Sequence, residues 1–460
     1  MNGTVTDLRS RVSDLMPRAH DDLAALVACQ SVADPSQFPG SECLRAAQLV
    51  IDNFADAGLR DLRLEQTPDG HPAVFGEIPA PDGAPTVLLY CHYDVQPPLD
   101  PSGTAWKTPA FQLTDRDGRW YGRGAADCKG NIVVHLTALR ALQGRFPVGI
   151  KLLAEGSEEQ GTGGLEAFVP PHAELLEADA IIVADSGNFA SGVPTFTTSL
   201  RGVSEVTVTV RTLETPVHSG DYGGAAPDAL LGLIRMLATL RDAQGNTTIR
   251  GLDGDATWQG IDYPVGQFRT DAHVLDGVDL TGSGRVQDMI WSRPAVTVLG
   301  IDCPSVADSA AAIPAQARAR VSLRVPPGMD AKHAQDALVA HLQAVTPWHA
   351  KVEIERDSPG PPFSASTSGP AYSAMDEALQ DAYGRPTTAE GAGGSIPLCN
   401  VLQDTFPDAE IMIIGVEEPH CLMHAPNESV DPSEIEHMAL AEALFLTRYT
   451  TRSIRTAGAR

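Results

Sequence analysis

Six acidic or imidazole side chains of the kinds that bind divalent metals and move protons are spread along this 460-residue chain. Five of them are the expected metal ligands: His92, Asp127, Glu159, Asp185 and His424. Carboxylate oxygens and imidazole nitrogens suit borderline metals such as zinc, and one carboxylate can bridge a metal pair. The sixth, Glu158, is the expected general base. The set predicts a two-metal hydrolase that cleaves an amide bond.

The tripeptide Ser157-Glu158-Glu159 is the least ambiguous element of this set. Adjacent carboxylates at the end of a strand point in opposite directions, so Glu159 can bind metal while Glu158 takes a proton from water. The alternative is that the two like charges repel and lie in solvent. Glu155 is another candidate for the pair, but its position nearer the body of the strand favours a structural role.

His92 and Asp94 follow another strand-like segment and, being two residues apart, point the same way. Asp94 can accept the second ring N–H of His92, which fixes the tautomer and leaves the other nitrogen for metal. Asp94 is therefore predicted to support a ligand without binding metal itself. The competing interpretation is an ordinary polar turn.

Asp127 lies in a glycine-flanked segment just before a predicted helix, where the glycines permit tight backbone turns. We favour a bridging ligand over the alternative, an aspartate that caps the helix. Asp185 is either the carboxylate of the second metal or a plain strand-end residue. His424 lies in a loop before a helix, and His420 is close enough to be confused with it.

The elements that must position these residues alternate between strands and helices. Continuous apolar runs at 86–91, 148–154 and 180–184 are typical of strands buried on both faces, and each precedes candidate metal or base residues. Helical patterns cover 5–29, 42–57, 132–142, 370–383 and 432–450, and a further strand covers 410–415. The pattern predicts an α/β fold with a mostly parallel sheet flanked by helices, and ligands gather beyond the carboxyl ends of such strands.

The pattern changes near residue 199. Residues 204–210 alternate with period two, as a strand with one solvated face does. Helices are expected at 228–241 and 331–344, strands at 296–299 and 317–325, and polar, Gly-rich sequence at 242–285. We therefore predict an inserted α+β domain at 199–360. Because His424 lies beyond it, the catalytic domain is expected to be discontinuous, at 1–198 and 361–460.

Composition excludes several classes of protein. The net charge of −26 argues against binding to nucleic acid or to an anionic membrane. No apolar window approaches the length of a membrane helix, and no secretory signal is visible at the N-terminus. Seven scattered cysteines without CxxC spacing favour a reducing cytoplasm, and Cys91 and Cys128 are expected to pack as small hydrophobic side chains.

Ordered motifs along nearly the whole chain resemble the cocatalytic zinc aminoacylase and carboxypeptidase family, in its carnosine dipeptidase-like branch. The motifs are HYDVQPP, GRGAADCKGN, EGSEEQG, ADS, HSGDYGG, VSLRVPP, GGSIP and MHAPNE. The resemblance implies one metal on His92, Asp127 and Asp185. It implies a second metal on Asp127, Glu159 and His424, with Glu158 as general base.

The resemblance also implies that the insert is a lid and dimerisation domain. His218 would reach the active site of the partner subunit in a homodimer and stabilise the oxyanion. Arg324, with Gly394 and Ser395, would bind the carboxylate of the substrate. Relatives often carry a polar residue where this chain has Ala311, which puts a close identity of substrate in question.

The expected substrate is a dipeptide or short peptide with a free C-terminal carboxylate. An N-acyl amino acid deacylase is the close alternative, because the chemistry is the same. A catalytically silent metal-binding protein is a remote one, since Glu158 is intact. Zinc is the expected metal, although manganese and cobalt accept the same ligands.

Overall fold

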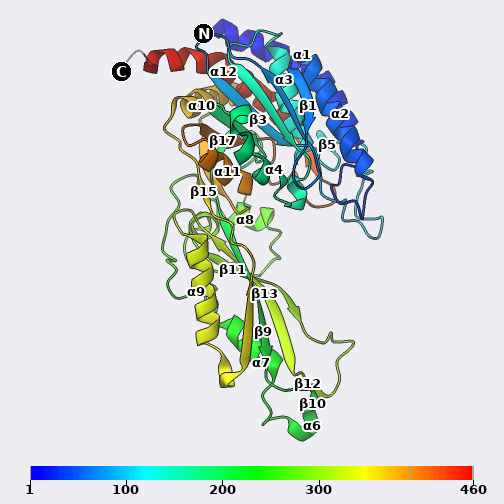
Figure 1. Ribbon diagram of the computed structural model, residues 1–460, viewed down its shortest axis with the longest axis vertical. Coiled ribbons are helices and arrows are strands. Elements are labelled where there is room, and N and C mark those ends of the chain that lie inside the picture. Colours follow the sequence, from blue (N-terminus) through cyan, green and yellow to red (C-terminus); the bar gives the residue numbers. More distant parts are fainter. Residues whose placement is uncertain (1, 395, 458–460) are drawn as a thin grey trace. The chain divides into compact units, whose positions relative to one another are not determined.

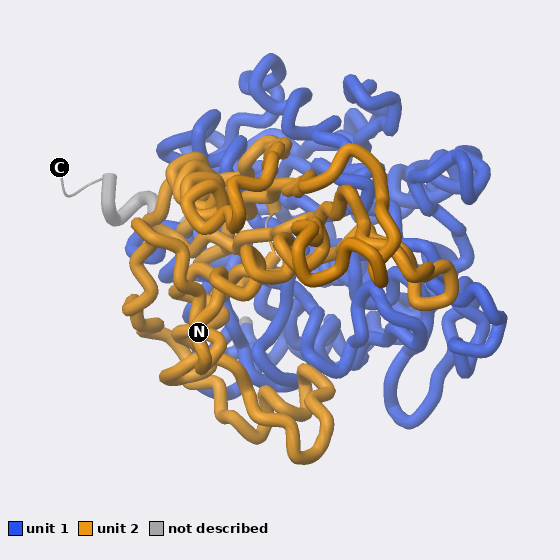
Figure 2. Tube along the Cα trace, turned by 90° about the horizontal axis from the view of Figure 1, so that it is seen from below, with its two compact units in different colours: residues 1–198, 365–390, 398–460 blue, residues 199–364, 391–397 orange. Residues whose placement is uncertain are grey.

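The computed structural model describes residues 2–394 and 396–457 (Figure 1). The chain folds as two compact units (Figure 2). Unit 1 comprises residues 1–198, 365–390 and 398–460, and unit 2 comprises 199–364 and 391–397. The second boundary thus falls after Ser364, four residues beyond the expected one. The short segment 391–397, which the sequence assigned to the catalytic domain, packs with unit 2.

The large sheet has four parallel strands at its centre, in the order β6-β3-β7-β17. Antiparallel strands β2 and β1 extend it on one side, and β8 and β15 on the other. The expected α/β fold is confirmed, with a mixed sheet. The strands are β1 (Arg60–Glu65), β2 (Ala73–Ile78), β3 (Thr86–His92), β6 (Gly149–Glu155), β7 (Ala180–Ala184), β8 (Thr195–Leu200), β15 (Phe363–Ser364), β16 (Thr388–Ala392) and β17 (Glu410–Ile414).

Helices cover this sheet, and α3 lies deepest among them. It contacts α1, α12 and strand β3, and all its residues but Arg140 are buried, since it is apolar on every side apart from a few bonded polar groups. The helices are α1 (Asn2–Val27), α2 (Gly40–Asp56), α3 (Lys129–Ala141), α4 (Gly164–Phe168), α5 (Ala173–Leu176), α10 (Pro370–Tyr383), α11 (Pro397–Thr405) and α12 (Pro432–Ala457). A small sheet holds β4 (Thr114–Arg116), β5 (Arg119–Tyr121) and β18 (Ser429–Val430).

Unit 2 is built on an antiparallel sheet in the order β11-β13-β9-β14. Val206, Val208 and Val210 of β9 share one face, where Leu233 of α7 and Leu338 of α9 pack against the same apolar cluster. The period-two pattern at 204–210 therefore marks a strand with one covered face, as expected. The elements are β9 (Gly202–Arg211), β10 (Val217–His218), β11 (Ala295–Asp302), β12 (Ala312–Ile313), β13 (Gln316–Val325), β14 (Lys351–Arg356), α6 (Ser219–Tyr222), α7 (Ala229–Ala238), α8 (Val265–Asp271) and α9 (Ala331–Ala344).

Helix α8 lies in the polar, Gly-rich stretch for which the sequence predicted no element. It is short and none of its residues is buried, so it leaves little periodic signal. None of the helices among the described residues combines the length and apolar character that a membrane span requires.

Candidate active site

The two carboxylate oxygens of Asp127 face two different groups of metal-binding side chains. His92 Nε2 lies 3.0 Å from Asp127 Oδ1 and 3.1 Å from Asp185 Oδ1. His424 Nε2 lies 3.0 Å from Asp127 Oδ2 and 3.0 Å from Glu159 Oε2. All five expected ligands therefore converge, with Asp127 between a His–Asp and a His–Glu group. Three carboxylates and two imidazoles in this arrangement fit a pair of divalent cations bridged by Asp127.

Strand ends bring these residues together. His92 is the last residue of β3, Asp185 directly follows β7, and the turn with Glu159 follows β6. These three strands are parallel neighbours, so their carboxyl ends meet at one edge of the sheet. His424 comes from the loop after β17 and has a φ of 60°, in the left-handed region.

The glutamate pair is arranged differently from our expectation. Glu158 and Glu159 lie in a short 3₁₀ turn, Glu158–Gln160, three residues beyond the end of β6. Their directions therefore do not follow from strand alternation. The Asp94 carboxylate fixes this turn: its Oδ1 accepts the N–H of Glu158 and its Oδ2 accepts the N–H of Glu159, both at 3.1 Å.

Asp94 also contacts the side chain of His92. His92 Nδ1 is 3.3 Å from Asp94 Oδ1 and 3.1 Å from the Asp94 backbone oxygen. Both are acceptors, so Nδ1 carries the proton and Nε2 is free to bind metal. One fully buried carboxylate thus orients a metal-type histidine and holds the turn of the expected base.

Glu428 is a buried residue whose role the sequence reasoning missed. Its Oε2 lies 2.6 Å from Arg123 Nη1 and accepts the N–H of Gly124, while its Oε1 accepts the N–H groups of Ala126 and Asp127. Glu428 therefore fixes the backbone that carries Asp127. The sequence signal was its place in the same motif as His424.

Glu417 is a second missed residue. One of its oxygens lies within 4.8 Å of ligand atoms of Asp127 and Asp185. It is buried, and Asn131 Nδ2 donates to its Oε1 at the long distance of 3.4 Å. Burial first, and then the charges of Asp127 and Asp185, raise the pKa of Glu417 well above its usual value. Nothing in its local sequence distinguishes it from its neighbour Glu418.

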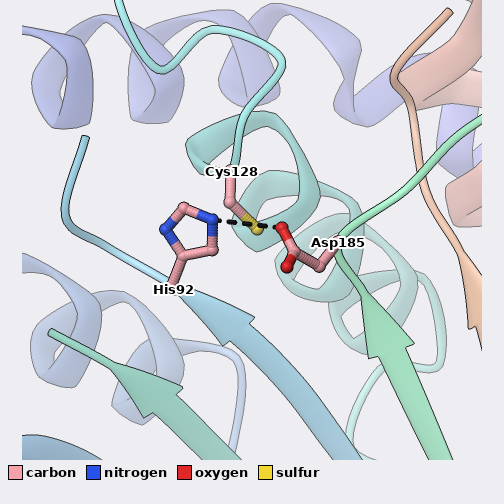
Figure 3. Close-up of side chains that lie close together, drawn as sticks. All are labelled: His92, Cys128 and Asp185. Atoms are coloured by element: carbon pink, nitrogen blue, oxygen red, sulfur yellow. Dashed lines mark hydrogen bonds and ion pairs between the residues drawn. The ribbon is translucent and has the colours of Figure 1, made fainter. Parts of the chain in front are cut away.

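Cys128 lies beside His92 and Asp185, as Figure 3 shows. Its Sγ contacts the backbone oxygen of Ala184 at 3.0 Å, and burial raises the pKa of the thiol to about 12. The thiol thus donates to a backbone oxygen, as an uncoordinated cysteine does. The geometry thus leaves His92 and Asp185 as the metal-type groups of this trio.

Burial and mutual charge perturb the whole cluster. Hydrogen bonds with Asp127 and Glu159 raise the pKa of His424 to about 11, and burial followed by the charge of Asp185 raises the pKa of Glu158 to about 9. The pKa of Asp127 is lowered, because its hydrogen bonds with both histidines outweigh burial. Several perturbed pKa values within one cluster are typical of active sites.

The candidate residues of unit 2 belong to different elements. His218 is at the end of β10, and its Nδ1 accepts the N–H of Gly220 at 3.1 Å, so its Nε2 carries the proton in the neutral ring. Ala311 is next to it, since its oxygen accepts the N–H of Ser219. Arg324 is near the end of β13, and Gly394 is exposed. Ser395 lies outside the described residues.

Comparison with known proteins identifies the family to which the chain belongs. The family model described as "Peptidase family M20/M25/M40" matches residues 88–448, which include every expected metal ligand. The chain belongs to this peptidase family. The resemblance found in the motifs is therefore confirmed, and the chain is a metal-dependent peptidase.

Individual relatives extend the comparison over most of the chain. It is 45% identical to the cysteinylglycine-S-conjugate dipeptidase of Corynebacterium striatum over 88% of this chain and 90% of that protein. It is 27% identical to the Beta-Ala-His dipeptidase of Rattus norvegicus over 88% and 87% of the two chains. The solved structure of the di-peptidase Dug1p from Saccharomyces cerevisiae has a TM-score of 0.81 at 22% identity, covering 98% and 99%, and so supports the fold.

Proposed function

We propose that this protein is a metal-dependent dipeptidase for cysteinylglycine, or its S-conjugates, with a free C-terminal carboxylate. The observation that carries the proposal is the position of Asp127 between the His92–Asp185 and His424–Glu159 groups. The names of the relatives supply the substrate class. They favour a dipeptidase over the N-acyl amino acid deacylase that the sequence alone left open.

The residues around Asp127 divide the work as follows. His92 and Asp185 would hold one cation and Glu159 and His424 the other, with zinc the first choice and manganese or cobalt acceptable. When bound, two such cations supply Lewis acidity toward the scissile carbonyl and the attacking water. Glu158 accepts a proton from that water on its carboxylate and passes it to the leaving amine nitrogen.

His218 is proposed to stabilise the oxyanion from the partner subunit. Its Nδ1 is already an acceptor for backbone N–H groups, so the neutral ring presents Nε2–H as the donor. The side chain is 59% exposed in the single chain, which agrees with a partner outside this chain.

The homodimer is proposed to form through unit 2. Strand β11 is at the edge of the unit 2 sheet, and its Leu299 and Ile301 are 55% and 44% exposed. An apolar edge strand of this kind invites pairing with a second strand. The cytoplasm is the proposed location, because all seven cysteines are free and six of them are buried.

A substrate panel tests the activity. The chain is freed of metal with a chelator, reloaded with zinc, manganese or cobalt, and assayed on cysteinylglycine, an S-alkyl conjugate, β-alanyl-histidine and N-acetyl amino acids. We expect turnover of dipeptides only, restored by metal. Faster cleavage of N-acetyl amino acids than of any dipeptide would instead make the protein a deacylase.

Mixing two inactive variants tests the role in trans. Glu158→Ala and His218→Ala chains are combined, and heterodimers are isolated by two different tags. One site of each heterodimer then has both groups intact, so we expect up to about half of the native activity per dimer. Heterodimers with no activity would contradict catalysis by His218 across subunits.

A further inference from the structure

Unit 2 contains an arginine whose charge has no partner. Arg201 lies between β8 and β9, and its Nε and Nη1 are shielded from water, with no hydrogen-bond acceptor in the part of the chain that the structure describes. Unsatisfied donors of this kind are costly, more so on a charged group. Arg123 and Arg140 also have one unsatisfied nitrogen each, but both form ion pairs. Arg123 pairs with Glu428, and Arg140 pairs with Asp22. Arg201 has no ion pair among the described residues.

A second guanidinium adds to this excess of positive charge. Arg324 of β13 is paired in register with Val203 of β9, two residues from Arg201. It forms no hydrogen bond or ion pair with any part of the chain that the structure describes. Burial, followed by the charge of Arg324, lowers the pKa of Arg201 to about 10. Arg201 and Arg324 carry like charges at the same end of the sheet, and an anion bound between them would offset the repulsion.

A glycine and a cavity of unit 2 lie beside the Arg201 side chain. A Cβ on Gly393 would lie 3.0 Å from Arg201 Nη2, so the glycine lets the backbone approach the guanidinium closely. Arg201 also lines a cavity of about 650 Å³ in unit 2. The other two arginines of this cavity are already bonded to backbone oxygens: Arg241 to Val296 and Arg293 to Ser283.

We propose that Arg201 binds the C-terminal carboxylate of the substrate together with Arg324, so that two guanidinium groups share its two oxygens. This inference rests on the proposed dipeptidase function, which supplies a substrate with a free carboxylate. Arg201 extends the substrate-binding set predicted from the motifs. A bound carboxylate would also explain why its Nε and Nη1 lack acceptors among the described residues. Charge-assisted, forked contacts of this kind are the strongest that a carboxylate can receive.

The test compares a carboxylate with its neutral amide. KM is measured for cysteinylglycine, and cysteinylglycinamide is measured as a competitive inhibitor, so that it need not be cleaved. In Arg201→Met we expect KM to rise about 10- to 100-fold, from the loss of a hydrogen bond to a charged group. The inhibition constant of the amide should change less than twofold. A KM that stays constant, or that rises together with the inhibition constant, overturns the proposal.

Two further variants guard against a purely structural effect. Arg318→Met removes an exposed arginine of the same strand as Arg324, paired with Asp302, and should leave both constants unchanged. Arg201→Lys keeps the charge without the fork, and should raise KM several-fold even if the Met variant does not fold. If the native protein cleaves no dipeptide, the proposed function fails. If it does and the Arg201→Lys variant binds both ligands normally, only this inference fails.

Discussion

At the residue scale, two buried or partly buried aspartates hold the turn that carries Glu158 and Glu159. Asp94 binds both backbone N–H groups and His92, and it is fully buried. The loop has a second support, because Ser157 Oγ donates to Asp69 at 2.7 Å. The backbone therefore positions both Glu158, the proposed base, and Glu159, the proposed metal ligand, so their side-chain roles can be separated by substitution.

Replacement of Glu158 by Gln should separate binding from catalysis. We expect a loss of about 100- to 10,000-fold in kcat, the usual contribution of a general base, with two metal ions still bound per chain. Calorimetric titration of the metal-free variant checks the stoichiometry and an assay with cysteinylglycine checks the rate. Near-native turnover in the metal-loaded variant would exclude Glu158 as the base.

At the scale of elements, buried ion pairs connect segments that are distant in sequence. Glu428, just before β18, binds Arg123 in the loop after β5, and both side chains are almost completely buried. His135 of α3 binds Glu442 of α12 at 2.7 Å in the same way. These pairs join elements around the metal-type residues, so breaking them should affect stability first and activity as a consequence.

Truncation of Glu428 leaves a buried guanidinium without its carboxylate. We expect Glu428→Ala to lower the free energy of unfolding by about 3–5 kcal/mol, the usual cost of breaking a buried pair, and to weaken metal binding through the Asp127 backbone. Urea unfolding measures the first effect. Glu353→Ala, which breaks an exposed pair with Arg211, is the matched control and should change stability little.

The His135 pair should make stability depend on pH. Burial lowers the pKa of His135, but the charge of Glu442 and their hydrogen bond raise it more, so the net pKa lies above 6.5. Its Nε2 also faces an acceptor, the Tyr90 oxygen, at 3.3 Å, as the charged ring requires. The contribution is therefore complete below pH 6.5 and is lost as the pH rises through the folded pKa. Urea unfolding of native and His135→Gln chains should converge at high pH, and a difference independent of pH would contradict this.

At the scale of the whole molecule, all five expected metal ligands belong to unit 1. Each bound metal ion should therefore stabilise unit 1 directly, by about 2.7 kcal/mol when the free metal is about 100 times its dissociation constant. Unit 2 has an apolar core of its own beneath β9 and β13. The two units should therefore respond differently when metal is removed.

Hydrogen exchange with and without a chelator tests this difference. We expect faster exchange in residues 122–135 and 421–430 of unit 1 after metal removal, because these segments carry or support Asp127 and His424. Strands β9 and β13 should exchange at the same rate in both conditions. Equal acceleration in both units would mean that the metal stabilises the molecule as a whole.

The amino-acid sequence determined the fold class and identified five metal-type side chains that converge in the structure. Apolar runs before His92 and Asp185 identified buried parallel strands, and the carboxyl ends of such strands must meet at one edge. The residue types then required a cationic partner, because so many carboxylates cannot share a buried edge alone. Period-two alternation likewise identified strand β9 of unit 2.

Only the tertiary structure decided the remaining contacts. The 3₁₀ turn of Glu158, the support that Glu428 gives to Asp127, the approach of Glu417 and the unpaired nitrogens of Arg201 all depend on residues that meet through folding. Their local sequences carry no periodicity or turn signal for these contacts. A buried polar side chain is defined by what surrounds it, and distant segments form that environment, as where Glu428 meets the backbone of Gly124, 304 residues away.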